Sequence, residues 1–92
     1  MRIKIRVFGN LIPLLGDESI VELEANSRLK DLIYNLSKKT YNAKENILGQ
    51  YDASKSDLVI LLNGTNIYAL NRLETPLKEG DVVTFLPPLV GG

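Results

Sequence analysis

The sequence contains no cysteine and no histidine among its 92 residues. Without cysteine no disulfide framework can form, and the redox state of the surroundings cannot be inferred from thiols. The chain also lacks the commonest metal ligand, the commonest general base and the best thiol nucleophile. The usual zinc sites and the Cys-His and Ser-His-Asp triads are therefore excluded. An enzyme acting alone would have only carboxylates, lysines, tyrosines and hydroxyl groups.

Long apolar segments and an excess of one charge are also absent. The longest apolar run, at residues 58–62, is too short to cross a bilayer. Eleven basic residues balance eleven acidic ones, so neither nucleic acid nor an anionic membrane is suggested as a partner. The first residues alternate like a strand and lack the apolar segment of a signal peptide, so we expect a cytoplasmic protein. The length predicts a single domain over 1–92 with a tail over 87–92.

Alternation of apolar and polar residues predicts three of the strands. Residues 2–8, "RIKIRVF", have three aliphatic side chains on one face, and "ESIVELEA" at 18–25 predicts a second strand in a hairpin with the first. Glycines and a proline between them predict a loop with one helical turn. The last strand is "DVVTFLP", with Val83 and Phe85 on one face and Val82, Thr84 and Leu86 on the other.

A change of period at residues 28–40 predicts the main helix. Its apolar stripe, at spacing i, i+3, i+4 and i+7, consists of Leu29, Leu32, Ile33 and Leu36. We expect Ser27 as the N-cap, and Lys38 and Lys39 near the end suit the helix dipole. The polar segment 41–57 follows, with a short helix predicted at about 43–48.

The second half of the chain completes the fold prediction. The run at 58–62 predicts a strand covered for most of its length, and Asn63-Gly64 predicts a tight turn. A short returning strand is expected at 67–69 and a loop at 70–81. The order β-β-α-β-β-β is that of an α+β protein in which one helix covers a mixed sheet. A compact solution places the first and last strands side by side and parallel, which is the ubiquitin-like β-grasp roll.

The chain ends in an unusual tail, "FLPPLVGG". After Phe85 and Leu86 it consists of Pro87, Pro88, Leu89, Val90, Gly91 and Gly92. Two prolines favour a stiff, extended segment, and two glycines without Cβ atoms can enter a narrow channel. Such a tail can deliver its carboxylate into the active site of another protein. An activated carboxylate gives a thiocarboxylate with sulfide and an amide with an amine. The alternative is that the prolines only end a strand and the glycines are a frayed end.

Three pairs of acidic residues are weaker candidates for a carboxylate or metal site. These pairs are Asp17 with Glu18, Glu22 with Glu24, and Glu79 with Asp81. The middle pair points outward from a strand, and the other two lie at turns, where such residues are common. The four tyrosines show no spacing typical of a nucleic-acid stacking platform beside a basic patch. We therefore expect solvated acidic faces and no metal site.

The segment "EGDVVTFLPPLVGG" at 79–92 resembles the C-terminus of the MoaD/ThiS sulfur carriers, most closely the MoaD branch. The matching pairs are Gly80-Asp81, Pro87-Pro88 and Gly91-Gly92. The opening "IKIRVFGNL", the following Leu15-Gly16 and the later "LLNGT" are also similar to the family. Val90 departs from the pattern, because many relatives have a smaller residue there.

The resemblance implies a β-grasp sulfur carrier that serves as the small subunit of molybdopterin synthase. A ubiquitin-activating-type adenylyltransferase would use ATP to adenylate Gly92, and a sulfur donor would convert it to a thiocarboxylate. The tail would then enter the large subunit of molybdopterin synthase, where the sulfur would pass to cyclic pyranopterin monophosphate. The chain itself would bind no cofactor. It would act as a carrier subunit and not as a catalyst on its own.

The resemblance also assigns roles to residues. Gly92 would be the reacting group and Gly91 the slender neck. The inserted arm would consist of Pro87, Pro88, Leu89 and Val90. Partner docking in the family uses an apolar patch on the sheet face away from the helix; Phe8 and Leu86 fall on that face by alternation, and Lys4 and Arg6 flank it. The alternatives are an aromatic Phe8 folded back into the core and a solvated strand face carrying Lys4 and Arg6.

Two further functions remain open at the level of the sequence. One is a ubiquitin-like modifier whose Gly92 is conjugated to lysines, or which supplies sulfur for tRNA thiolation. The other is a plain β-grasp binding module with an inert tail. The Pro87-Pro88 pair favours the molybdopterin branch over the modifier, because it belongs to the tail pattern of that branch.

Overall fold

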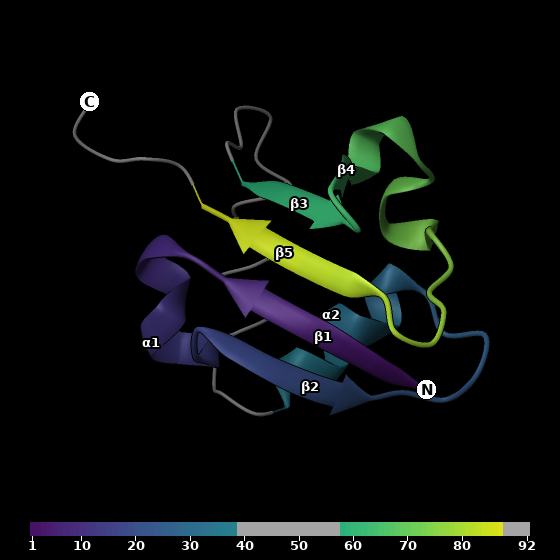
Figure 1. Cartoon of the computed structure of the whole chain (residues 1–92), viewed down its shortest axis with the longest axis horizontal. Coiled ribbons are helices and arrows are strands. Elements are labelled where there is room, and N and C mark those ends of the chain that lie inside the picture. Colours follow the sequence, from purple (N-terminus) through teal and green to yellow (C-terminus); the bar gives the residue numbers. More distant parts are fainter. Residues whose placement is uncertain (39–57, 88–92) are drawn as a thin grey trace.

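The computed structural model describes residues 1–38 and 58–87, and within them five strands form one mixed sheet (Figure 1). The sheet order is β2-β1-β5-β3-β4. The strands are β1 (Arg2–Val7), β2 (Glu18–Glu22), β3 (Val59–Leu62), β4 (Thr65–Asn66) and β5 (Val82–Leu86). The α-helices are α1 (Ile12–Leu15) and α2 (Leu29–Ser37), and the 3-10 helices are η1 (Gly9–Leu11), η2 (Ile67–Ala69) and η3 (Arg72–Glu74).

The central pair of the sheet joins the two ends of the sequence. β1 and β5 are parallel, with Lys4 opposite Val82 and Val7 opposite Phe85. β2 pairs antiparallel with the other side of β1, and β3 pairs antiparallel with β5. The predicted parallel neighbours, and the β-grasp arrangement that depends on them, are confirmed.

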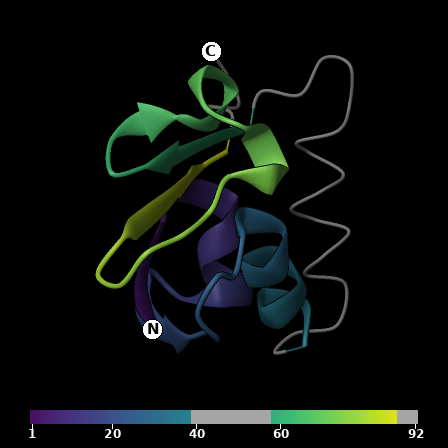
Figure 2. The ribbon, with the colours of Figure 1, turned by 90° about the vertical axis from the view of Figure 1, so that its right-hand side faces the viewer.

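One face of the sheet packs on α2 and forms the core (Figure 2). The strands bury alternate residues against the apolar side of the helix because side chains along a strand point to opposite faces. The buried sheet residues are Ile3, Ile5, Val7, Val21, Ile60, Leu62, Val83 and Phe85, and the buried helix residues are Leu29, Leu32, Ile33 and Leu36. Both predicted faces of β1 and β5, and the apolar stripe of the helix, are therefore confirmed.

The cap of α2 differs from the prediction. The N-cap residue is Arg28, whose backbone N–H donates to Oδ2 of Asp31 at 2.8 Å. Ser27 is not the cap, since the helix begins at Leu29 and Ser27 lies one residue before the N-cap; its carbonyl oxygen accepts a hydrogen bond from the N–H of Leu77 at 2.9 Å. Lys38 is the C-cap residue, whereas Lys39 lies outside the described residues.

The second half of the sheet is shorter and more open than predicted. β3 buries only alternate residues, and its Val59 and Leu61 are half-buried on the outer face. β4 ends at Asn66, and residues 67–69 form η2 instead of the expected strand. The Asn66 side chain accepts a hydrogen bond from the N–H of Tyr68 at 2.9 Å, which favours a turn over an extended chain. The helix predicted at 43–48 lies outside the described residues.

Glu74 in η3 connects the loop before β5 to the start of α2. Its carboxylate contacts Nη1 of Arg28 at 2.7 Å and Nζ of Lys30 at 3.1 Å. The hydrogen bonds from Arg28 and Lys30 hold the pKa of the Glu74 carboxyl below its ordinary value of 4.5. All three side chains are about half exposed, so the network orients the loop more than it stabilises the fold.

A polar clasp fixes the turn between β3 and β4 to the start of β5. Asn63 and Gly64 both have positive φ, as the predicted tight turn requires. The Asn63 amide donates to Oδ1 of buried Asp81 at 2.9 Å, and its own oxygen accepts the N–H of Val82 at 2.9 Å. Oδ2 of Asp81 accepts the N–H of Lys78 at 2.7 Å. Asp81 is therefore a structural residue of the clasp.

Replacing Asp81 with alanine should lower the free energy of unfolding by about 2 kcal/mol, because it removes two partly buried hydrogen bonds, from Asn63 and Lys78, at about 1 kcal/mol each. Glu24→Ala is the control, since Glu24 is also acidic but exposed. Urea denaturation of both variants measures the difference. Equal stability of the two variants would contradict the role assigned to the clasp.

Candidate functional site

The tail begins at the centre of the sheet. β5 lies between β1 and β3, and its last residue, Leu86, is paired with Val59. On the other side, the N–H of Phe8 donates to the carbonyl oxygen of Phe85 at 3.1 Å. Pro87 follows directly and is half-buried. The base of the tail is therefore held from both sides.

The rest of the tail lies outside the described residues. These residues are Pro88, Leu89, Val90, Gly91 and Gly92. Their expected roles, as an arm, a neck and a reacting carboxylate, stay predictions.

Gly9 packs closely against the base of the tail. Its φ is +68°, and a Cβ atom at this position would lie 2.9 Å from Cγ of Pro87. A side chain would therefore meet both backbone strain and a steric conflict with the proline ring. The sequence indicated Gly9 only as loop punctuation, because nothing local in the sequence predicts its contact with Pro87.

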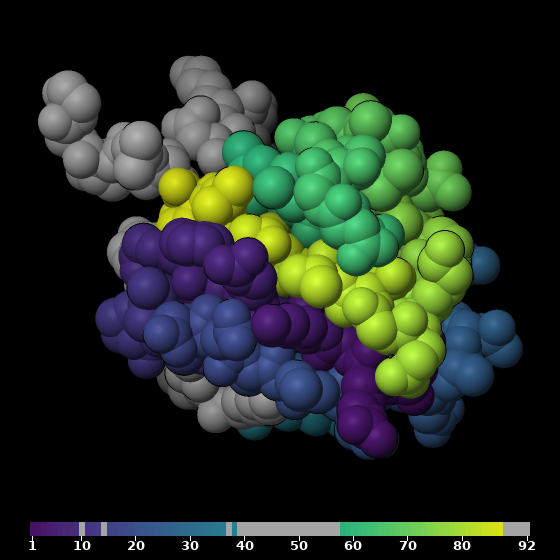
Figure 3. Space-filling model, in the orientation of Figure 1, coloured from purple at the N-terminus to yellow at the C-terminus, as the bar shows by residue number. Residues whose placement is uncertain are grey.

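The outer face of the sheet is open to solvent and has two parts. The charged half covers β1 and β2 and consists of Arg2, Lys4, Arg6, Glu18, Ile20 and Glu22. The apolar half covers β5 and β3 together with the residue after β1, and consists of Phe8, Val59, Leu61, Val82, Thr84 and Leu86. Figure 3 shows the strands of both halves side by side at the surface.

Phe8 and Leu86 both belong to the apolar half. Phe8 is 42% exposed, so it does not fold back into the core, and that alternative is wrong. The Arg6 guanidinium lies 5.7 Å from the centre of the Phe8 ring. Leu86 is half-buried at the end of β5. Both side chains are accessible at the place where the tail begins, and their docking role stays a prediction.

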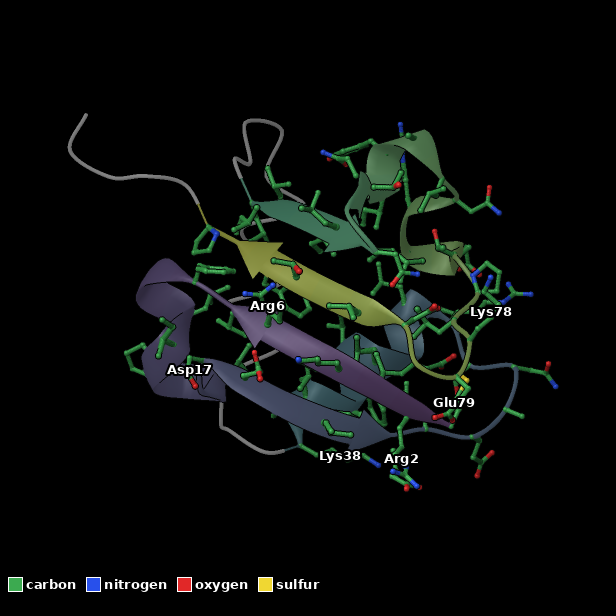
Figure 4. All side chains as sticks on the ribbon, in the orientation of Figure 1. Arg2, Arg6, Asp17, Lys38, Lys78 and Glu79 are labelled. Atoms are coloured by element: carbon green, nitrogen blue, oxygen red, sulfur yellow. The ribbon has the colours of Figure 1, made fainter. Side chains whose placement is uncertain are left out.

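Lys4 and Arg6 lie on β1 next to this apolar half (Figure 4 labels Arg6). Nζ of Lys4 is 3.5 Å from Oε1 of Glu18, and Nε of Arg6 is 3.8 Å from Oε2 of the same residue. The side chains are about half exposed, and ion pairs of this kind contribute little to stability. Lys4 and Arg6 therefore stand on a solvated strand face, and their role in partner docking stays a prediction.

The acidic pairs form no metal centre in the ranges 1–38 and 58–87, where no three His, Cys, Asp or Glu residues gather as ligands. Glu79 accepts the N–H of Arg2 at 2.9 Å, and Asp81 belongs to the clasp. Glu18 and Glu22 face cations of β1. In the same ranges, no helix has the length and apolar character needed to cross a membrane.

Gly9→Ala should destabilise the chain more than Gly64→Ala. Both positions have positive φ, which costs about 1 kcal/mol for a side chain. Nothing lies within 4 Å of a Cβ at Gly64, whereas the Cβ at Gly9 meets Pro87. The conflict should add about 1 kcal/mol or more, as overpacking does.

A double-mutant cycle with Pro87→Ala isolates this contact. Removing the proline ring should abolish the steric part of the destabilisation and leave only the part caused by the positive φ. Urea denaturation of the four variants gives the coupling free energy. A coupling of zero would mean that Gly9 does not hold the base of the tail.

Comparisons with known proteins support the fold and the family resemblance of the tail sequence. The model of the ThiS family matches residues 5–92. A Pyrococcus furiosus protein assigned as molybdopterin converting factor, subunit 1, is 31% identical, with a TM-score of 0.78 over 97% of this chain and 99% of that chain. In Helicobacter pylori, the complex of subunits 1 and 2 of molybdopterin-converting factor contains a chain that is 28% identical, with a TM-score of 0.60 and complete coverage of both chains.

A third relative is named as a modifier protein. Small archaeal modifier protein 3 of Haloferax volcanii is 26% identical over the full length of both chains. The family match covers nearly the whole chain, including the Pro87-Pro88 and Gly91-Gly92 pairs from which the resemblance was first drawn. The chain belongs to the ThiS/MoaD family of sulfur-carrier and ubiquitin-like β-grasp proteins.

Proposed function

We propose that this protein is the sulfur-carrying small subunit of a molybdopterin synthase, with the carboxylate of Gly92 as the working group. One observation carries the proposal. The central strand β5 passes directly into the tail, and the base of the tail is held between Gly9, Phe8 and Val59. A rigid body thus presents a slender C-terminus from a fixed point, which suits insertion into a partner.

The proposed chemistry has two steps. The Gly92 carboxylate attacks the α-phosphate of ATP in an adenylyltransferase of the ubiquitin-activating type, which forms the acyl-adenylate and releases pyrophosphate. Sulfide from a sulfur donor then attacks the acyl carbon and displaces AMP, leaving a thiocarboxylate. The chain contains no cysteine or histidine, so the partners supply the sulfur and the general base.

The carrier, now bearing the thiocarboxylate, then docks on the large subunit. There its sulfur bonds to a carbon of cyclic pyranopterin monophosphate in place of an oxygen, and water hydrolyses the acyl–sulfur bond, which restores the Gly92 carboxylate. The Helicobacter pylori relative, which forms a complex of two subunits of molybdopterin-converting factor, supports a second subunit as the partner. In this proposal the apolar half of the outer face makes the contact through Phe8 and Leu86. Lys4 and Arg6 lie at its border, where they can meet acidic residues of the partner.

A second candidate function is supported by the full-length similarity to small archaeal modifier protein 3. In that role the activated Gly92 forms an amide with a lysine of another protein, or supplies sulfur for tRNA thiolation. Activation at the carboxylate is common to both functions, so the product at Gly92 discriminates between them.

The intact mass of the protein from its native cells should reveal a fraction with sulfur in place of one oxygen, located at Gly92 by fragmentation of the C-terminal peptide. A branched peptide that joins Gly92 to a lysine would instead establish the modifier. A chain that ends at Val90 should carry neither product and should unfold at the same urea concentration as the full chain. Persistent absence of both products under all growth conditions would count against the carrier function.

Phe8→Asp should weaken binding to the purified large subunit by about tenfold or more, because it places a charge in the centre of an apolar contact. Ile20→Asp is the matched control, since Ile20 is also exposed on the outer face but belongs to the charged half. Titration calorimetry with the full chain measures both. A loss that is equal for the two variants would argue against the apolar half as the docking surface.

A further inference from the structure

β2 is the edge strand on the side of the sheet farthest from β4 (Figure 1). In the part of the chain that the structure describes, it pairs only with β1. The N–H of Val7 donates to the carbonyl of Asp17 at 2.9 Å, and that of Leu23 to the carbonyl of Met1 at 2.8 Å. Since hydrogen-bonded pairs alternate along antiparallel strands, the backbone groups of Glu18, Ile20 and Glu22 point away from β1.

The side chains of these three residues lie on the outer face. Ile20 is 64% exposed, the highest value among the large apolar residues that the structure describes. It lies between two glutamates on the same face, Glu18 and Glu22. Edge strands are commonly protected by charge, but here an aliphatic side chain stands at the centre of the edge. The combination of outward backbone groups and an exposed isoleucine is typical of a site for strand addition.

The two glutamates are only loosely paired with the cations of β1. Glu18 is 3.5 Å from Lys4 and 3.8 Å from Arg6, and Glu22 is 3.9 Å from Arg2. These pairs are long, their side chains are 46–78% exposed, and such pairs are weak. The cations of β1 approach from one side only. The edge side of each carboxylate remains open among the described residues.

We propose that the edge of β2 binds an extended segment of a partner protein in which two basic residues flank an aliphatic one, in the order basic–x–aliphatic–x–basic. Backbone hydrogen bonds to Glu18, Ile20 and Glu22 hold the segment. Residues that pair in this way place their side chains next to each other on one face. The two basic residues then meet the glutamates, and the aliphatic residue covers Ile20. The site is symmetric about Ile20, so its charge pattern accepts either strand direction.

A second copy of the chain does not fit this edge. Antiparallel pairing of two β2 strands about Ile20 places Glu18 of each copy opposite Glu22 of the other. The two like-charged pairs would destabilise such a dimer. The C-terminal tail is also a poor occupant, because it has no basic residue and its two prolines lack N–H groups. The partner is therefore a different protein. β1 separates this edge from the apolar half, so the proposal does not depend on the tail or its chemistry.

The test uses the full chain labelled with ¹⁵N and the peptide acetyl-Gly-Lys-Thr-Val-Thr-Lys-Gly-amide as the probe. The amide resonances of Glu18, Ile20 and Glu22 should shift, and their hydrogen exchange should slow. A peptide with glutamate in place of both lysines should bind about tenfold more weakly or worse, and added salt should weaken the lysine peptide. Equal binding of the two peptides, or shifts confined to β3 and β5, would overturn the proposal.

Substitutions in β2 separate the backbone and charge contributions. Ile20→Pro removes an N–H that does not bond to β1, so the fold should persist while binding of the peptide is lost. Glu18→Gln with Glu22→Gln should weaken binding about fivefold or more, whereas Glu24→Gln, outside β2, should not. Should Ile20→Pro fail to fold, the glutamine pair still decides. Retention of full affinity by the glutamine pair, or dimerisation of the chain through β2, would refute the proposal.

Discussion

The parallel pairing of β1 with β5 is the constraint on which the other features depend. Parallel strands cannot be joined by a tight turn, so everything between Val7 and Val82 forms a long crossover connection. That connection includes α2, which covers the inner face of the same strands and removes them from water. The pairing also brings the start of the tail beside Phe8 and Gly9, at the end of the first strand. The base of the C-terminal tail is therefore held in place by residues near the N-terminus.

The same strands divide the outer face by charge. β1 carries three cations on this face and β2 carries two glutamates, whereas β5 and β3 carry aliphatic residues and one threonine. Burying the apolar half removes few charges from water, so it costs little desolvation free energy. Burying the charged half would require a partner that supplies new charges and hydrogen bonds. One sheet thus offers two surfaces that differ in the partner chemistry they accept.

Periodicity in the sequence predicted β1, β5 and α2 because the burial of alternate or helically spaced residues dictates both sequence and structure there. It was wrong at 67–69, where "IYA" is as apolar as a strand but the Asn66 side chain caps a turn. The cap predicted from residue type at Ser27 was also wrong, because the helix begins one residue later, with Arg28 at the N-cap and its N–H donating to the carboxylate of Asp31. The packing of Gly9 on Pro87 was not predicted, because the parallel pairing of the first and last strands does not by itself specify which residues touch beyond their ends, and the contact leaves no local pattern.

The chain lacks the side chains that could activate its own C-terminal carboxylate, so the reactivity proposed for Gly92 depends on partner proteins. A main-chain carboxylate is chemically ordinary, and this sequence places no cysteine or histidine beside it. Sulfur transfer and protein conjugation would begin from the same acyl-adenylate, so the carboxylate itself does not determine which of the two reactions follows. The choice must then depend on which partner binds the folded body while the tail is inserted. In this proposal the apolar half, which adjoins the base of the tail, would determine the fate of the activated terminus.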